Sequence, residues 1–255
     1  MANERLRRAI IDADLTVAQL AAHVGVDPKT VERWITKDRI PHPRHRVRSS
    51  RRLGVDEAEL WPLAADDGHA RAASEAELIR LYPHRGVVPK DLWYELLDSA
   101  KESVDMLVYA GLFLPDGHAD LAALVADKAR QGARVRLMFG DPASPALHQR
   151  GLEEGIGEGL SARAKLSLAY LEDAFGVPGL DVRLHTTTLY NSIFRYDDDM
   201  LVNMHTFGAP AAQSPVLHLR RIPGGRLFDH YLKSLERVWE KARPVAGPEE
   251  SGQAT

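Results

Sequence analysis

The sequence predicts an all-α domain at the N-terminus, followed by an α/β domain in which helices cover both faces of a mainly parallel sheet. Three observations support this fold class: apolar residues recur at helical spacing near the N-terminus, short apolar runs alternate with amphipathic segments afterwards, and basic residues concentrate at the start of the chain. The predicted parts are an N-terminal domain at 1–61, a linker at 62–76, an α/β domain at 77–243 and a disordered tail at 244–255.

After an amphipathic helix over residues 4–15, the next twenty residues predict two short helices joined by a tight turn. Thr16 can cap the first helix, and Gln19 stands at the capping-box position. Gly25 lies where the turn needs a positive φ. Asp27 can cap the second helix, whose first position holds Pro28.

The second helix, over residues 28–36, has distinct inward and outward faces. Val31, Trp34 and Ile35 form its apolar side. The residues left outward are Lys29, Thr30 and Arg33, which suit contact with phosphates and base edges. The alternative is an ordinary helical hairpin with a solvated charged face.

Charge is unevenly distributed along the chain. Residues 1–53 hold 12 Lys/Arg and 6 Asp/Glu, a formal +6, whereas residues 54–255 hold 21 and 30, a formal −9. Contact with phosphates needs such a concentration. The arginine-rich stretch at 40–52 is either a short helix or an extended arm along the phosphate backbone. In it, His42 and His45 favour proton-dependent DNA contact over metal binding.

Residues 4–61 resemble the helix-turn-helix of Xre/Cro/434-repressor-like regulators. The matching segments are Thr16-Val-Ala-Gln-Leu-Ala, Gly25-Val-Asp-Pro-Lys-Thr-Val and Arg33-Trp. The resemblance implies five helices, with the third in the major groove of DNA. The resemblance weakens after residue 36, where the family has a turn and a fourth helix and this chain has Ile40-Pro-His-Pro. With the arginine-rich stretch included, the predicted DNA-binding residues are Gln19, Lys29, Thr30, Arg33, Arg39, Arg44, Arg46 and Arg48.

Composition excludes several classes of protein. No run of 18 or more apolar residues exists and the N-terminus lacks an apolar core, so we expect neither a membrane span nor a secretory signal. Without cysteine there is no disulfide, thiolate nucleophile or Cys-ligated zinc. We expect a cytoplasmic protein with no cofactor.

The second domain alternates helices and strands along the chain. Predicted helices cover 74–81, 90–103, 119–131, 160–175 and 227–242, and predicted strands cover 104–109, 134–139, 181–185, 193–196, 200–204 and 216–220.

This order of elements resembles the phospholipase D-like fold over residues 90–243. The similar segments are Val135-Arg-Leu-Met-Phe-Gly-Asp-Pro, Val182-Arg-Leu-His and Asn191-Ser-Ile-Phe-Arg-Tyr-Asp-Asp-Asp. The family signature is His-x-Lys with Asp five residues beyond the Lys. Here the two registers place Asn191 and Ile193, or Tyr190 and Ser192, at the His and Lys positions. The resemblance therefore implies the fold without the hydrolase reaction.

Polar residues gather at or near the predicted strand ends, where ligands bind in such sheets. Arg150 and Arg195 suit bidentate bonds to phosphate or carboxylate. The alternative is that these residues cap strands, form hydrogen bonds in turns and pair within buried networks. His185 and His205 with Asp197 or Asp198 could form a metal site, but the His-x-x-x-His spacing of a helix is missing. The predicted ligand-binding residues are Asp141, Arg150, His185, Asn191, Ser192, Arg195, Asp197, Asn203 and His205, with no catalytic or metal residue.

The sequence thus predicts a transcriptional regulator that binds double-stranded DNA. We expect a homodimer, because one helix-turn-helix reads only a few base pairs. The α/β domain would sense a small anionic or phosphorylated ligand, mediate dimerisation, or both. The alternatives are a phosphodiesterase or nuclease with a rearranged site that uses His185 or His205, and a module that only dimerises.

Overall fold

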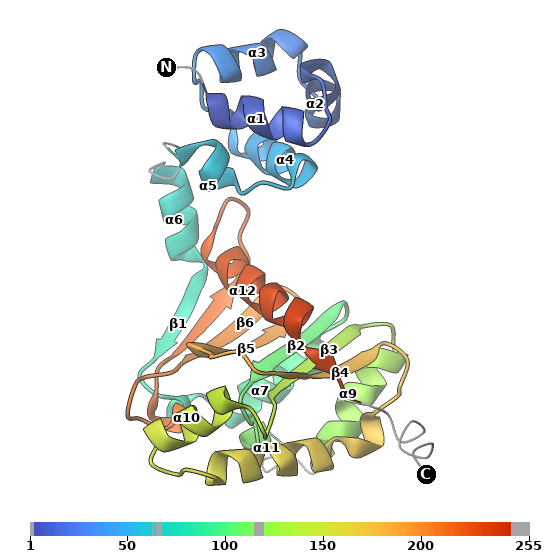
Figure 1. Ribbon diagram of the computed structural model, residues 1–255, viewed down its shortest axis with the longest axis vertical. Helices are drawn as coiled ribbons and strands as arrows, with labels where there is room; N and C mark the ends of the chain where they lie inside the picture. The colour runs from blue at the N-terminus through green and yellow to red at the C-terminus, as the bar shows by residue number, and fades with distance from the viewer. Residues whose placement is uncertain (1–2, 63, 65–67, 115–119, 246–255) are drawn as a thin grey trace. The chain divides into compact units, whose positions relative to one another are not determined.

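The computed structural model describes residues 3–62, 64, 68–114 and 120–245. The chain divides into two compact units (Figure 1). Unit 1 comprises Met1–Ala76 with Ile222–Arg226, and unit 2 comprises Glu77–Arg221 with Leu227–Thr255. Most of the predicted tail, residues 246–255, lies outside the described residues.

Unit 1 is helical throughout its described secondary structure. The arginine-rich stretch forms a helix, which decides between the two conformations predicted for it. The prediction of a helix over residues 74–81 is wrong, because α6 ends at Ala76 and a strand begins at Leu78. The helices are α1 (Glu4–Asp12), α2 (Val17–Val24), α3 (Pro28–Thr36), α4 (Pro43–Leu53), α5 (Glu57–Leu60) and α6 (Gly68–Ala76).

Local sequence determines the turn between α2 and α3. Thr16 and Gln19 form a complete capping box, in which each side chain accepts a hydrogen bond from the other residue's backbone N–H. Gly25 adopts a φ of 81°, which glycine reaches without steric cost. The Asp27 carboxylate accepts from the N–H of Lys29 at 2.8 Å, so α3 begins at Pro28.

The core of unit 1 forms around Trp34, which packs edge-on against Trp61 with ring centroids 6.4 Å apart. Three further fully buried side chains of this core are Leu20, Val24 and Val31. The core therefore fixes which side of α3 faces outward.

A segment far away in sequence completes unit 1. The backbone N–H of Arg226 donates to Ser74 Oγ at 3.0 Å, and its guanidinium donates to Glu57 and to the carbonyl of Ala64. Residues 222–226 lie between the last long strand and last helix of unit 2, so the chain passes between the units three times.

Unit 2 contains an eight-stranded sheet in the order β1-β7-β6-β5-β2-β3-β4-β8. The prediction of a mainly parallel sheet is wrong. Among the strand pairs in the described residues, β2–β3 and β3–β4 are parallel, and the other five are antiparallel. The strands are β1 (Leu78–Tyr82), β2 (Ser103–Val108), β3 (Arg134–Gly140), β4 (Leu180–His185), β5 (Asn191–Tyr196), β6 (Asp199–Met204), β7 (Val216–Arg220) and β8 (Arg243–Pro244).

The short connection after β5 explains the antiparallel half of the sheet. Only Asp197 and Asp198 separate β5 from β6, and parallel strands would need a crossover of a dozen or more residues. Asp197 takes a φ of 51°, as turn residues of such hairpins do.

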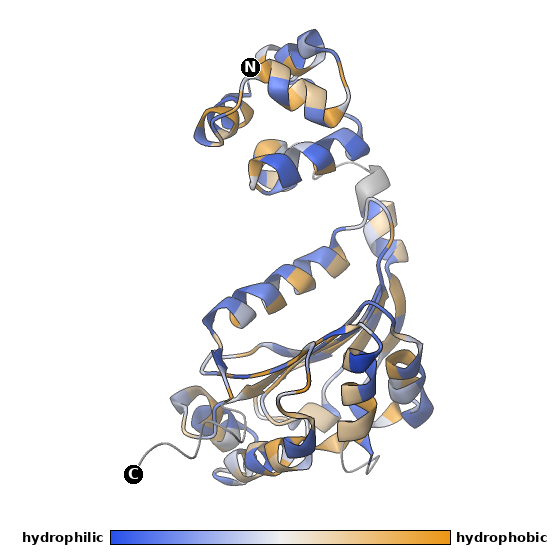
Figure 2. Cartoon of the chain, turned by 90° about the vertical axis from the view of Figure 1, so that its right-hand side faces the viewer, coloured by the Kyte–Doolittle hydropathy of each residue, from blue (hydrophilic) through white to orange (hydrophobic). Residues whose placement is uncertain are grey.

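Helices cover both faces of the sheet, as predicted. Trp93 of α7 and Val125 of α9 lie in the core on one face of the sheet. Phe228 and Leu235 of α12 belong to the core on the other face, and Figure 2 shows α12 along its face of the sheet. One helix, α10, lies in a stretch for which the sequence analysis predicts neither a helix nor a strand. The helices are α7 (Lys90–Ser99), α9 (Leu121–Arg130), α10 (Pro145–Glu153), α11 (Gly159–Tyr170) and α12 (Leu227–Lys241).

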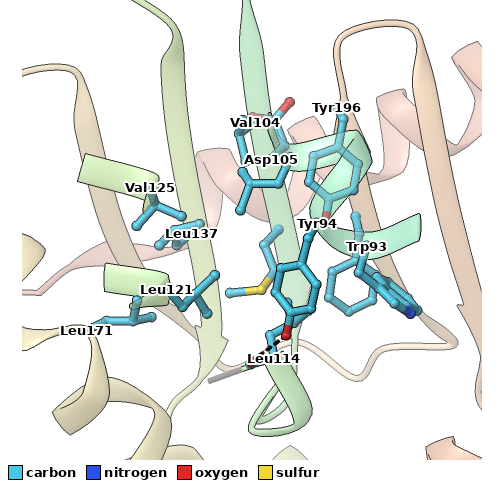
Figure 3. A pocket seen from close by; sticks show the side chains of 13 residues that line it. Trp93, Tyr94, Val104, Asp105, Leu114, Leu121, Val125, Leu137, Leu171 and Tyr196 are labelled. Carbon is cyan, nitrogen blue, oxygen red and sulfur yellow. Dashed lines mark hydrogen bonds between the residues drawn. The ribbon is translucent and has the colours of Figure 1, made fainter. Parts of the chain in front are cut away.

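The core beside α7 and α9 encloses a small apolar void of about 20 Å³ (Figure 3). Trp93 and Tyr196 are among the residues that line it, and the Tyr94 hydroxyl donates to the carbonyl of Leu114 at 3.2 Å. A space of this size holds about one water molecule, so it belongs to the packing of the core.

A buried ionic network joins α12 to the sheet. Asp105 on β2 lies in register with Arg136 on β3 and Arg195 on β5. Its carboxylate accepts from Arg136 at 2.5 Å and from Arg195 at 3.0 Å. Arg136 also donates to both carboxylate oxygens of Glu236 on α12, at 2.7 and 2.8 Å, and these partners raise the pKa of Arg136 against the opposing effect of burial.

We predict that Asp105→Asn lowers the free energy of unfolding by about 3 kcal/mol, because two buried guanidinium groups lose their shared carboxylate. Urea unfolding measures the change. Asp181→Asn, on an exposed position of β4, is the control and should stay within about 0.5 kcal/mol of wild type. Equal stabilities for the two variants would contradict the network's role.

Candidate functional site

The outward side of α2 and α3 carries the first group of predicted site residues. Gln19, Lys29 and Arg33 are exposed, and Thr30 is half-buried. Neither Lys29 nor Arg33 forms an ion pair with any described residue. Lys29 and Arg33 are four positions apart, so they lie on one stripe of α3. We call Lys29, Thr30 and Arg33 the α3 face.

The predicted arginines beyond α3 differ in their surroundings. Arg39 and Arg44 are exposed. Arg48 is also exposed, and it donates to the carbonyl of Val24 at 3.2 Å, which supports the end of α2.

Arg46 requires a correction to the predicted DNA-binding set. It is 2% exposed, and its guanidinium donates to Glu57 at 2.6 Å and to the carbonyl of Pro41 at 3.1 Å. These bonds join α4 to α5 and to the preceding turn. Arg46 therefore stabilises unit 1 and cannot reach a phosphate.

In unit 2 the structure brings together three of the predicted ligand-binding residues. Ser192 Oγ and His205 Nε2 lie 3.0 Å apart. Asn203 is fully buried near them; its carbonyl oxygen accepts from Arg85 at 3.3 Å, and its amide donates to the carbonyls of Ser214 and Pro215.

Two predicted arginines form structural bonds instead. Arg150 is 3% exposed and donates to Glu154 at 2.8 Å and to the carbonyls of Thr206 and Ala209. Arg195 belongs to the network of Asp105 described above. Neither guanidinium is available for a ligand, so the predicted bidentate contacts do not fit the geometry.

The remaining predicted residues are dispersed. Asp197 accepts from three backbone N–H groups at residues 101–103, and these bonds lower its pKa against the effect of burial. Asp141 pairs with Arg243 at 2.9 Å. His185 is buried and bonds to the carbonyl of Val108 at 3.0 Å. Asn191 is half-buried at the start of β5.

A cavity of about 370 Å³ lies at the end of the sheet where β2 finishes and β5 begins. We call it the strand-end pocket. Among the residues that line it are Arg85, Tyr109, Phe113, Arg163, Ser192 and His205.

Sequence reasoning missed four of these pocket residues. Arg85, Tyr109, Phe113 and Arg163 come from a 3₁₀ turn at Arg85–Val87, from the segment after β2 and from α11. Only the fold brings these segments together. The sequence signal that pointed to this end of the sheet was the group of polar residues at predicted strand ends, among them Ser192, Asn203 and His205.

His205 is held neutral in this pocket. Its Nδ1 lies 3.2 Å from the carbonyl of Leu189, which can only accept, so Nδ1 carries the proton and Nε2 accepts from Ser192. Burial, followed by the positive charges of Arg150 and Arg85, lowers the pKa of His205 to about 4. The ring also stacks on Tyr109, with centroids 5.5 Å apart.

No group of three or more His, Asp or Glu side chains within the described ranges is placed to hold a metal ion. In the same part of the chain, no helix combines the length and apolar character that crossing a bilayer requires.

We predict that wild type loses stability as the pH falls from about 6.5 to about 4, in part through His205. Over this range unfolded His205 binds a proton and folded His205 does not, because its pKa drops from 6.5 to about 4. His205→Gln should remove up to about 3 kcal/mol of this dependence. Urea unfolding across the pH range tests this, with exposed His230→Gln as the control; parallel curves for wild type and His205→Gln would contradict it.

No protein-family model matches the chain, and no curated protein matches it in sequence. Solved structures that are similar to it in fold include the following two. Nuc, a phospholipase D family member from Salmonella typhimurium, shares 14% identity over 61% of this chain and 90% of its own, with a TM-score of 0.38. TrmBL2, an archaeal chromatin protein described with a novel mode of DNA binding, shares 15% identity over 86% of this chain and 72% of its own, with a TM-score of 0.41. These similarities are too low to carry a functional argument, so the proposals below rest on this chain's own residues.

Proposed function

We propose that this protein is a DNA-binding transcriptional regulator. In this proposal α2 and α3 form an Xre/Cro-like helix-turn-helix, α3 enters the major groove, and two copies bind a palindromic site. Unit 2 acts as a phospholipase D-like domain without catalysis that senses a small ligand, holds two copies together, or both.

The observation that carries the proposal is the α3 face. An acidic residue three or four positions away would pair with a cation on the helix surface, whereas Lys29 and Arg33 form no ion pair with a described residue. Arg33 has a planar guanidinium that matches the two acceptors of guanine in the major groove. Lys29 lies one turn earlier, near the start of α3, where its ammonium group can contact a phosphate.

Gln19 and the exposed arginines extend this surface. The side-chain oxygen of Gln19 accepts from Thr16, which leaves its amide NH₂ group free to donate at the start of α2. Arg39, Arg44 and Arg48 supply contacts to phosphates, which position a protein on DNA without reading sequence.

We predict that Arg33→Ala weakens binding to a specific duplex by about 1–3 kcal/mol and relaxes its sequence preference. A duplex selected by the wild-type protein from a random pool, titrated by fluorescence anisotropy at fixed salt, measures the loss. The control is Arg130→Ala, which removes the same charge from an exposed position of α9. Unchanged affinity and preference in Arg33→Ala would exclude α3 as the recognition helix.

A phosphodiesterase is the second candidate, and the Ser192–His205 pair favours it. With Nδ1 donating to Leu189, Nε2 is oriented to take the proton of the Ser192 hydroxyl, as a general base does for a nucleophile. The low pKa of His205 makes it a weak base, so we place this candidate second.

We predict that the purified protein does not cleave bis(p-nitrophenyl) phosphate. Hydrolysis that disappears in Ser192→Ala would contradict the non-catalytic proposal and support the enzyme; hydrolysis that persists in that variant would come from elsewhere than this pair.

A further inference from the structure

Arg85 differs from four arginines that the fold also takes out of water and that find a carboxylate, and from Arg183, which donates to the backbone carbonyls of Trp239 and Ala242. Arg46, Arg136, Arg150 and Arg195 each donate to at least one carboxylate. Arg85 has no ion pair with a described residue: its guanidinium bonds to the neutral amide oxygen of Asn203 and lies 4.1 Å from the centroid of the Phe113 ring.

Nearby charges do not compensate for the burial of Arg85. Burial lowers its pKa to about 10; the negative charge of Glu154 opposes this and the positive charge of Arg163 adds to it. Glu154 is already bonded to Arg150 at 2.8 Å. Arg163 forms no ion pair within the described chain, and neutral His205 adds no charge. The strand-end pocket is therefore lined by two guanidinium groups and one carboxylate, that of Glu154, which Arg150 already neutralises.

We propose that the strand-end pocket binds a small phosphate monoester, with Arg85 and Arg163 holding its phosphate group. This deepens the ligand-sensing part of the proposed function and does not depend on contact with DNA. An uncompensated guanidinium in a cavity costs stability, and a dianion between two guanidinium groups removes that cost through charge-assisted hydrogen bonds.

The rest of the pocket suits an organic group attached to the phosphate. Its volume of about 370 Å³ falls in the range of small-molecule sites. Tyr109 and Phe113 provide aromatic walls, and the oxygen of Ser192 can accept from a ligand hydroxyl while its proton is directed to His205. A divalent cation would be repelled by Arg85 and Arg163, so the charge of the site selects an anion.

Inorganic phosphate and glycerol 3-phosphate are the probes, used on the full chain at constant ionic strength. We expect wild type to show a saturable rise in melting temperature with each probe, larger for the ester, because ligand that binds only the folded state stabilises it. Isothermal titration calorimetry gives the dissociation constants.

Arg85→Met should raise the melting temperature without phosphate and abolish the saturable rise with either probe. Arg163 is exposed, so Arg163→Met keeps the test decisive if the Arg85 variant fails to fold. Arg163→Met should weaken binding about tenfold. Arg237→Met, an exposed change on α12, should behave as wild type.

Arg33→Ala separates this site from the proposed DNA surface. The proposal is supported if Arg33→Ala retains the phosphate response while Arg85→Met loses it and Arg163→Met weakens it. This result supports phosphate binding in the strand-end pocket whether or not the protein binds DNA. The absence of a saturable response in wild type, or a response that Arg33→Ala removes and Arg163→Met retains unchanged, would overturn it.

Discussion

Burial of arginine is the constraint that organises both units of this protein. A guanidinium withdrawn from water needs a carboxylate or several carbonyl oxygens, because leaving its charge unpaired is costly. Arg46 meets Glu57 and so joins α4 to α5. Arg136 meets Asp105 and Glu236 and so fastens α12 to the sheet. These pairs stabilise the scaffold and leave no donor for a partner molecule.

The same constraint separates structural arginines from functional ones. Arg33 is exposed and free of ion pairs among the described residues, which suits a transient partner such as a base edge. Arg85 is largely enclosed and lacks a carboxylate, which suits a ligand that brings its own negative charge. The two arginines lie in different units, so DNA contact and ligand binding are assigned to separate surfaces.

Local patterns made the α2–α3 turn predictable. Thr16, Gly25 and Asp27 each act on the backbone within three residues, and the structure places every one of them in its predicted role. Strands β2 to β7 were also predictable, because a short apolar run is likewise a local pattern in the sequence. The antiparallel half of the sheet was not predictable in this way, because strand direction depends on which strands pair, and apolar runs do not encode pairing.

The candidate site in unit 2 was less predictable, since its character depends on burial and on distant partners. Arg150 and Arg195 stand near strand ends in the sequence, as ligand-binding arginines do, yet Glu154 and Asp105 neutralise them. Arg85 lies more than a hundred residues from Asn203, its hydrogen-bond partner, and no sequence pattern joins the two. Ser192 and His205 were predicted as ligand-binding residues and lie together at the pocket, although their roles remain a prediction.

Hydrogen–deuterium exchange of the full chain, with and without a duplex selected from a random pool, tests the central claim most directly. The account predicts slower exchange in the presence of DNA over residues 16–37 and over the exposed part of 39–52, with the strands of unit 2 unchanged. Slower exchange over the sheet, with residues 16–37 unaffected, would contradict the assignment of DNA binding to α2 and α3.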